Sequence, residues 1–214
     1  MAYRILCLAI GYAFGLFQTG YLYGKSQGID IRKVGSGNAG TTNTLRALGP
    51  KAGLIVMIGD IMKCLLAILI THFLFGRKMY EMDYLLRIYT AIGCILGHNY
   101  PFYMKFKGGK GVACTAGLII ATSLPLTLIE AVVFFGTVSA THFVSLASML
   151  VGTVFLIGTF ILGKMGHFHT TAGYLTEIYV LITFVVLEIF WRHRSNIDRL
   201  RRGVENKTFI FKKK

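Results

Sequence analysis

The stretch that decides the fold is residues 97–111, which read GHNYPFYMKFKGGKG. It holds one histidine, one asparagine, three lysines and four glycines, and hydrophobic segments lie on both sides of it. Glycines allow backbone N–H groups to turn toward a ligand, and lysines add positive charge, so this composition favours a loop that binds an anion. We expect the following residues to contact that anion: Lys105, Lys107, Gly108, Gly109, Lys110 and Gly111.

Two glycine patterns resemble nucleotide-binding loops only in part. In the pattern G-x-x-x-x-G-K-[ST], Gly111 stands where Ser or Thr is required, and the first glycine would fall on Met104. Gly35, Gly37 and Gly40 match G-x-G-x-x-G, but no alternation of strands and helices surrounds them. The sequence therefore does not predict a nucleotide site.

The composition places this loop in an integral membrane protein. Of the 214 residues, 54% are hydrophobic and 15% are charged, and the mean hydropathy of +0.61 is too high for an ordinary soluble domain. The cysteines lie in apolar runs without the C-x-x-C spacing of metal sites, so we predict free, buried thiols, no metal ion and no organic cofactor. They are Cys7, Cys64, Cys94 and Cys114.

Six hydrophobic runs predict an all-α membrane bundle that forms a single domain over residues 1–214. The runs cover about 2–23, 52–75, 84–96, 112–140, 150–162 and 173–190. A helix of about 20 apolar residues crosses the hydrocarbon core. The first run has the length of a signal peptide, but no small-x-small cleavage site ends it, so we expect a retained helix.

The run at 112–140 decides how many times the chain crosses the membrane. It is shorter than the roughly 40 residues that two full spans need, and Pro125 lies near its middle. Basic residues crowd the segments 25–48, 97–111 and 192–214, which the positive-inside rule places in the cytoplasm. Only two crossings that turn at residues 123–125 satisfy that rule. We therefore predict seven transmembrane helices, the fourth and fifth short, with the N-terminus outside and the C-terminus cytoplasmic.

Two charges interrupt the second hydrophobic run. Asp60 and Lys63 are three residues apart and therefore share one face of a helix. Charges at membrane depth are costly unless they pair or line a polar cavity. We predict an ion pair with a structural role.

The topology gathers four polar segments at the cytoplasmic face, at 35–49, 97–111, 145–148 and 193–205. They supply many anion-binding groups and few carboxylates, which argues against hydrolysis by paired carboxylates and against a carboxylate-bound metal. A phosphate compound and a lipid-derived second ligand fit this chemistry. Ser145 and Ser148 either contact that ligand or bond back to a helix carbonyl. The tail that ends in residues 212–214 is expected to contact anionic lipid.

Three of these segments resemble the signature motifs of the bacterial membrane-embedded acyl-phosphate:glycerol-3-phosphate acyltransferases. They read GSGNAGTTNTLRALG at 35–49, GHNYPFYMKFKGGKGVA at 97–113 and HRSNIDRLRRGVENK at 193–207. FVSLAS at 143–148 fits as well, and the resemblance covers the whole chain. Cys114 departs from it, because a threonine is expected there.

The resemblance implies transfer of a fatty acyl group from acyl phosphate to the first-carbon (sn-1) hydroxyl of glycerol 3-phosphate. The products are lysophosphatidic acid and phosphate, the first acylation of phospholipid synthesis. It further implies a multi-pass protein of the bacterial inner membrane with its active site at the cytoplasmic face, and a functional link to an acyl-phosphate-forming enzyme. Membrane lipids are expected partners, and nucleic acid is not.

The resemblance also implies residue roles. The catalytic residues are expected to be Ser36, Arg46, His98, His193 and Asn196. Substrate contacts are expected from Asn38, Thr42, Asn43, Ser145 and Ser148 together with the lysine-glycine loop, and Glu205 is expected to be structural. The proton of the attacking hydroxyl could pass to either histidine or to a phosphate oxygen of the substrate, and we favour the phosphate.

Two other functions fit parts of the sequence. His193 and Asp198 match the H-x-x-x-x-D pair of thioester-dependent glycerolipid acyltransferases, but the later proline-glutamate-glycine motif is missing from the sequence. A phosphate-ester transporter would also be a basic helical bundle. Against transport, the polar groups cluster at one face, and the obvious midspan charges are Asp60 and Lys63 alone.

Overall fold

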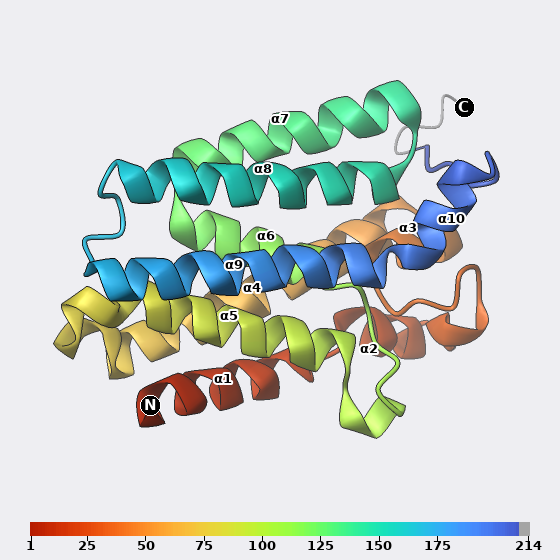
Figure 1. Cartoon of the computed structure of the whole chain (residues 1–214). Coiled ribbons are helices and arrows are strands. Elements are labelled where there is room, and N and C mark those ends of the chain that lie inside the picture. Colours follow the sequence, from red (N-terminus) through yellow and green to blue (C-terminus); the bar gives the residue numbers. More distant parts are fainter. Residues whose placement is uncertain (210–214) are drawn as a thin grey trace.

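The computed structural model describes residues 1–209, and their regular structure is helical, as predicted. Figure 1 shows long helices packed side by side, with short helices and loops at the two ends of the bundle. The α-helices are α1 (Ala2–Gly15), α2 (Thr19–Ser26), α3 (Thr41–Leu48), α4 (Pro50–Leu74), α5 (Asp83–Asn99), α6 (Val112–Thr122), α7 (Leu124–Thr141), α8 (Val144–Lys164), α9 (Ala172–Arg192) and α10 (Arg194–Arg201). The predicted lipid contact at Lys212, Lys213 and Lys214 lies outside the described residues.

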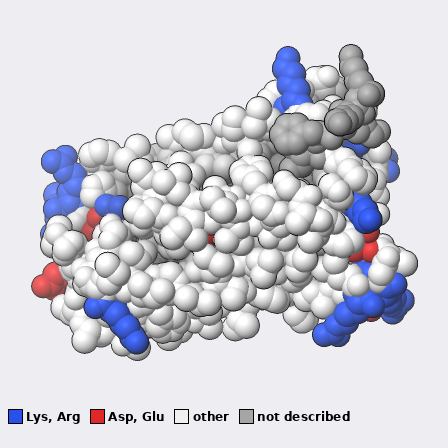
Figure 2. Space-filling view, turned by 90° about the horizontal axis from the view of Figure 1, so that it is seen from above, with Lys and Arg blue, Asp and Glu red and all other residues white. Residues whose placement is uncertain are grey.

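Five segments of the described chain are long and apolar enough to cross a membrane. They are Ala2–Ser26, Pro50–Lys78, Leu124–Thr141, Val144–Lys164 and Ala172–Arg192. Helix α5 has 17 residues, which is the lower limit for a full span, and α6 has 11, which is below it. Figure 2 shows charged side chains at the two ends of the elongated molecule and a nearly uncharged surface between them. This distribution is that of an integral membrane protein.

The first hydrophobic run is broken into α1 and α2. The break is held by Gln18, which is fully buried and donates its side-chain amide to the carbonyls of Gly15, Gly97 and His98 at 3.1, 3.3 and 3.1 Å. Because helix ends leave carbonyls without partners, this side chain stabilises the ends of α1 and α5 together. The N-terminal run is thereby attached to the start of the central loop.

The run at 112–140 turns near Ser123, where the sequence predicted a turn. Ser123 accepts a hydrogen bond from the N–H of Leu126, and Pro125 occupies the first turn of α7, where a missing N–H removes no helical hydrogen bond. Helix α6 is short, as predicted. The prediction that the next helix is also short is wrong, because α7 continues for 18 residues until His142 adopts a positive φ of 62°.

The polar segment that the sequence placed between the runs at 112–140 and 150–162 is also not a connection. The link between α7 and α8 consists of His142 and Phe143 alone, and Ser145 and Ser148 lie in the first turns of α8. The two serines are therefore fixed on a helix rather than carried by a loop.

The packing of α1 against α5 fixes the helix that leads to the central loop. Gly93 and Gly97 of α5 bring the two backbones together, since an added Cβ at these positions would lie 2.1 Å from the Leu8 carbonyl oxygen and 2.3 Å from the Tyr12 carbonyl oxygen. The other face of α5 contributes buried side chains such as Leu85 to the main apolar core. Helix α5 is thus held on two sides, which sets the position of His98 and Asn99 at its end.

Candidate active site

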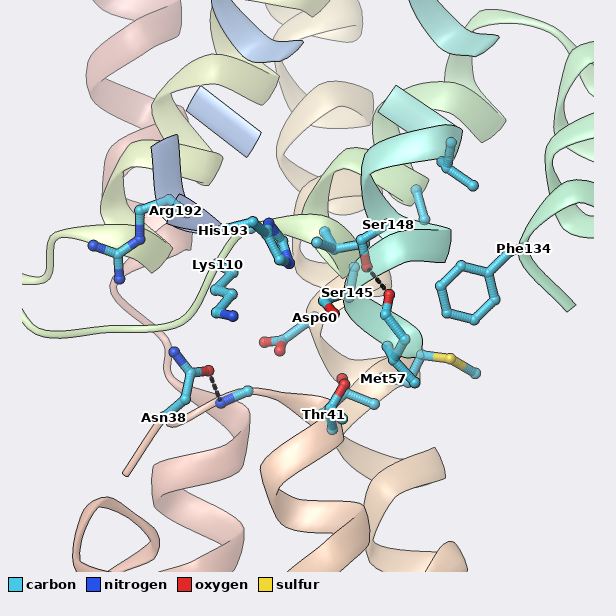
Figure 3. A pocket seen from close by; sticks show the side chains of 18 of the residues that line it. Asn38, Thr41, Met57, Asp60, Lys110, Phe134, Ser145, Ser148, Arg192 and His193 are labelled. Carbon is cyan, nitrogen blue, oxygen red and sulfur yellow. Dashed lines mark hydrogen bonds between the residues drawn. The ribbon is translucent and has the colours of Figure 1, made fainter. Parts of the chain in front are cut away.

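A cavity of about 580 Å³ lies at the end of the bundle that carries α3 and α10. Figure 3 shows Lys110, His193, Asn38 and Asp60 around one part of it and Phe134 and Met57 around another. The cavity therefore has a polar end and an apolar arm. The predicted site residues that line it are Ser36, Asn38, Thr42, Asn43, Arg46, His98, Lys110, Gly111, Ser145, Ser148, His193 and Asn196, and Asp60 and Glu205 join them.

Asn43 shapes the loop that carries Ser36. Its side-chain amide donates to the carbonyls of Ile31 and Val34 at 3.0 and 2.9 Å, and its oxygen accepts the N–H of Ser36 at 2.8 Å. Gly35 makes this turn possible with a φ of 58°. The polar atoms of Asn43 are thus used within the loop, whereas the hydroxyl of Ser36 remains exposed at the cavity.

Arg46 on α3 reaches the C-terminal segment. Its guanidinium donates to the Thr208 hydroxyl at 3.0 and 2.6 Å and to the Asn206 carbonyl at 2.9 Å. These contacts hold the first motif against the third. No motif pointed to Thr208, whose position opposite Arg46 depends on the fold.

Glu205 connects three polar side chains of the cavity. One carboxylate oxygen accepts from Asn196 at 2.7 Å and from Ser145 at 3.1 Å, and the other accepts from Arg199 at 2.8 Å. Burial acts to raise the pKa of Glu205, but these hydrogen bonds outweigh it and lower the pKa below its usual value. The carboxylate is therefore ionised at neutral pH, and the network supports the predicted structural role.

Lys110 extends this network toward the open part of the cavity. Its ammonium group donates to the side-chain oxygen of Asn196. Burial lowers the pKa of Lys110 to about 8, partly offset by Glu205, while nearby Arg199 and Arg192 lower it further. The positive charge of the ammonium group is thus only partly compensated by Glu205, so a bound anion would stabilise it, as expected for a group that binds phosphate.

His193 is held in one tautomer. Its Nδ1 lies 2.8 Å from the Ile189 carbonyl, so Nδ1 carries the proton and Nε2 is left as an acceptor. Burial and the charge of Lys110 lower the pKa of His193 to about 4. A neutral His193 can orient a hydroxyl group but is a weak base at neutral pH.

His98 ends α5 and contacts the predicted ion pair. Its Nδ1 lies 2.8 Å from the Lys63 ammonium, which in turn lies 2.8 Å from the Asp60 carboxylate. The backbone of Gly109 packs against the other ring nitrogen, because an added Cβ there would lie 1.9 Å from Nε2. Lys63 and Asp60 pair as the sequence predicted. His98 lines the cavity, and its catalytic role stays a prediction.

The lysine-glycine loop contacts the cavity through its last residues only. Gly108 and Gly109 donate their N–H groups to the carbonyls of Asn99 and His98 at 3.1 and 3.0 Å. The expectation that these N–H groups face an anion is therefore wrong, because the loop folds back on the end of α5. The Gly108 carbonyl accepts a hydrogen bond from the side-chain amide of Asn38 at 3.3 Å, and the Gly109 carbonyl accepts one from the Arg192 guanidinium at 2.7 Å.

Lys105 and Lys107 are exposed and lie outside the described lining of the cavity. A contact between these lysines and a substrate stays a prediction. Ser148 bonds back to the Val144 carbonyl at 2.8 Å, which is the alternative that the sequence left open, although the residue also lines the cavity.

Several lining residues were not singled out from the sequence. Arg192 was counted only as part of a basic segment, and Glu130 was not singled out at all. Within residues 1–209, groups of three or more His, Cys, Asp or Glu side chains arranged for a metal ion are not found. The cavity instead offers cations, amides and hydroxyls, which bind phosphate and carbonyl oxygens.

The chain is similar in sequence to known acyltransferases. The family model described as glycerol-3-phosphate acyltransferase matches residues 5–203. A glycerol-3-phosphate acyltransferase of Clostridioides difficile (strain 630) is 35% identical over 206 residues, which cover 95% of this chain and 94% of the relative. One of Macrococcus caseolyticus (strain JCSC5402) is 40% identical over 204 residues, which cover 94% of this chain and 95% of the relative.

The fold is similar to that of a solved acyltransferase. The crystal structure of PlsY (YgiH), an integral membrane glycerol 3-phosphate acyltransferase, in its glycerol 3-phosphate form has a TM-score of 0.82 and 32% identity, with 96% of each chain covered. The lysophosphatidic acid form has a TM-score of 0.80 and 31% identity, with 97% of this chain and 96% of that chain covered. The resemblance of the three motifs is thus confirmed over almost the whole chain, and this chain belongs to the family of integral membrane glycerol-3-phosphate acyltransferases.

Proposed function

We propose that this protein transfers a fatty acyl group from an acyl phosphate to the first-carbon hydroxyl of glycerol 3-phosphate. The observation that carries the proposal is that one continuous cavity joins a basic end built from all three motifs to an apolar arm. The forms of PlsY with glycerol 3-phosphate and lysophosphatidic acid support the acceptor and the product. In the reaction the hydroxyl oxygen bonds to the acyl carbon, the bond from that carbon to the phosphate oxygen breaks, and phosphate leaves.

The basic end has to bring two anions together. Lys110, Arg46 and Arg192 surround this end and offset the repulsion between the two phosphate groups. Ser36 and Asn196 supply hydrogen-bond donors for the charge that develops on the carbonyl oxygen. Because an acyl phosphate has a good leaving group, the protein can catalyse the reaction mainly by positioning the two substrates and stabilising the developing charge.

The attacking hydroxyl loses its proton to a phosphate oxygen of the substrate. His193 is a weak base with a pKa of about 4, and both ring nitrogens of His98 face protein groups. We expect His98→Ala and His193→Ala proteins that fold normally to lose rate but keep measurable turnover. Complete loss of turnover in either variant would assign the proton to that histidine.

The proposal includes the seven-helix topology that the sequence predicts. We propose that α5 and α6 also cross the membrane despite their length, with the N-terminus outside and the polar end of the cavity at the cytoplasmic face of a bacterial inner membrane. Soluble glycerol 3-phosphate would enter at that end. Acyl phosphate from an acyl-phosphate-forming enzyme would enter with its chain in the apolar arm, next to membrane lipid.

The test is conversion of glycerol 3-phosphate by the purified protein with palmitoyl phosphate or palmitoyl-CoA as donor. We expect lysophosphatidic acid from palmitoyl phosphate alone, and loss of this activity in a folded Ser36→Ala protein. Turnover with the thioester alone would overturn the assignment of the donor. Uptake of glycerol 3-phosphate into sealed vesicles without conversion would instead indicate transport.

The thioester alternative is disfavoured by the position of Asp198. Its side chain is 56% exposed and pairs with Arg202 at 3.1 Å, whereas His193 is buried at the cavity. The two residues therefore do not form a catalytic pair. We expect Asp198→Ala to retain most of the activity, and its inactivation would revive the alternative.

A further inference from the structure

The segment that follows α10 returns to the link between α7 and α8. Gly203 permits the reversal with a φ of 72°. Thr208 is buried at the end of this segment, and its N–H donates to the His142 carbonyl at 2.8 Å. The next ring, that of Phe209, lies 4.6 Å from the ring of His142. The backbone of Thr208 is therefore fixed in place by the rest of the bundle.

The side chain of Thr208 holds one end of Arg46. Its hydroxyl oxygen accepts from Nε at 3.0 Å and from Nη2 at 2.6 Å, and Nη2 also donates to the Asn206 carbonyl at 2.9 Å. A guanidinium carries five N–H donors, so these contacts engage three and leave the two on Nη1. Within residues 1–209, Nη1 has no hydrogen-bond partner. Arg46 thus lines the cavity with one end held and the other end free.

The charge of Arg46 is not paired with a carboxylate in the part of the chain that the structure describes. Its partners there, a hydroxyl and a backbone carbonyl, are neutral oxygens. Glu205 is close enough to influence the guanidinium, but both of its carboxylate oxygens accept hydrogen bonds from other side chains. An arginine held by neutral oxygens keeps its charge for an anionic ligand such as phosphate.

We propose that Thr208 is a positioning residue, which aims the free end of the Arg46 guanidinium at a substrate phosphate. This inference rests on the proposed acyl transfer. An arginine side chain loses rotamer freedom when it binds a ligand, and a side chain that is already held avoids most of that cost. Thr208 lies beyond the third motif at 193–207 and beyond the residues 5–203 that match the family model, so neither of them assigns it.

The test compares two substitutions of Thr208. Thr208→Val keeps the shape of the side chain and removes the hydroxyl, whereas Thr208→Ser keeps the hydroxyl. Glycerol 3-phosphate is varied at saturating palmitoyl phosphate, and the reverse. We expect kcat/KM to fall about five- to fiftyfold in Thr208→Val and to stay within about threefold of the native value in Thr208→Ser. The substrate whose kcat/KM falls more identifies the phosphate that Arg46 contacts.

A double-mutant cycle shows whether Thr208 acts through Arg46. Arg46→Lys keeps a positive charge but cannot form the planar fork that Thr208 holds. In that background we expect Thr208→Val to lower kcat/KM further by less than about twofold. A further loss as large as in the native background would overturn the proposal, because Thr208 would then act independently of Arg46. Native activity in Thr208→Val would overturn it as well.

The matched control is Thr176→Val on α9. It makes the same substitution at an exposed threonine whose hydroxyl donates to the Ala172 carbonyl at 3.0 Å, and it should leave kcat/KM unchanged. Thermal midpoints in detergent separate positioning from support of the fold. A lower midpoint of Thr208→Val with native kcat/KM per folded protein would assign Thr208 a structural role and overturn the proposal.

A binding measurement keeps this proposal separate from the proposed reaction. Failure of the native protein to use palmitoyl phosphate would overturn the donor assignment, but calorimetric titration with inorganic phosphate would still test Thr208. We expect the native protein and Thr208→Ser to bind phosphate about five- to fiftyfold more tightly than Thr208→Val. Equal affinity of the three proteins would overturn the positioning role.

Discussion

At the scale of single residues, Lys110 is a cation whose charge changes with pH just above neutrality. Its pKa is lowered to about 8, so the free enzyme loses this charge as the pH rises through that value. We expect kcat/KM for glycerol 3-phosphate to fall above about pH 8, and the fall to move to higher pH in Lys110→Arg, whose guanidinium stays charged. A native profile that is flat between about pH 7 and 10 would contradict this assignment.

The stability of the protein provides the control for this pH profile. A lysine in the unfolded chain has a pKa of about 10.4, so between about pH 8 and 10.4 the unfolded state binds more protons at Lys110 than the folded state. The contribution of Lys110 to the free energy of unfolding therefore increases with pH over this window. Activity and stability should change in opposite directions, which separates loss of charge from loss of fold.

Glu205 is a second residue whose role can be measured. Glu205→Gln removes the charge that Arg199 and Asn196 contact, and a buried hydrogen bond to a charged group contributes about 1.5–3 kcal/mol. If Asn196 acts on the reacting group, kcat should fall about ten- to hundredfold while KM changes less. Asp198→Asn, which alters an exposed ion pair, is the matched control. An equal effect in both variants would remove Glu205 from the positioning network.

At the scale of elements, the close contact of α1 and α5 depends on glycine. An added Cβ at Gly93 would lie 2.1 Å from the Leu8 carbonyl oxygen, so Gly93→Ala must separate the two helices. We expect a loss of about 1–3 kcal/mol in the free energy of unfolding and a lower thermal midpoint in detergent. Gly136→Ala on α7 is the control, because its added Cβ would meet no described atom within 4 Å, and it should be neutral or stabilising. Equal midpoints would contradict the packing argument.

The elements also show which features a sequence can and cannot predict. The turn at Ser123 was predictable, because Pro125 and the distribution of basic residues are local or compositional signals. The break after Gly15 was not, because the groups that stabilise it, the carbonyls of Gly97 and His98, lie far along the chain. The same holds for the loop glycines. The sequence predicted that their N–H groups bind an anion, but in the folded chain these groups donate to backbone carbonyls.

For the candidate site, the motifs predicted which residues line the cavity better than what each one does. Ser36, Lys110 and Asn196 were expected there and lie there. Glu130 was not, because a single glutamate within a hydrophobic run carries no motif, and its burial against an open arm exists only in the packed bundle. Residue type and spacing identify shared chemistry, whereas partners and orphaned groups require three-dimensional contacts.

At the scale of the whole molecule, the orientation of the bundle in the membrane can be measured with single cysteines. Lys33, Lys107, Lys78 and Met165 are exposed. The connections α2–α3 and α5–α6, which hold Lys33 and Lys107, lie at the end with the cavity, whereas the connections α4–α5 and α8–α9, which hold Lys78 and Met165, lie at the opposite end (Figure 1). The four native cysteines are fully buried, so they should react little with a membrane-impermeant maleimide. In intact cells we expect labelling of Lys78→Cys and Met165→Cys but not of Lys107→Cys or Lys33→Cys, and the reverse in inverted vesicles. Reaction of both ends from the same side would contradict an odd number of membrane crossings between the two ends. Reversed labelling would place glycerol 3-phosphate binding outside the cell, where a cytoplasmic metabolite could not reach it.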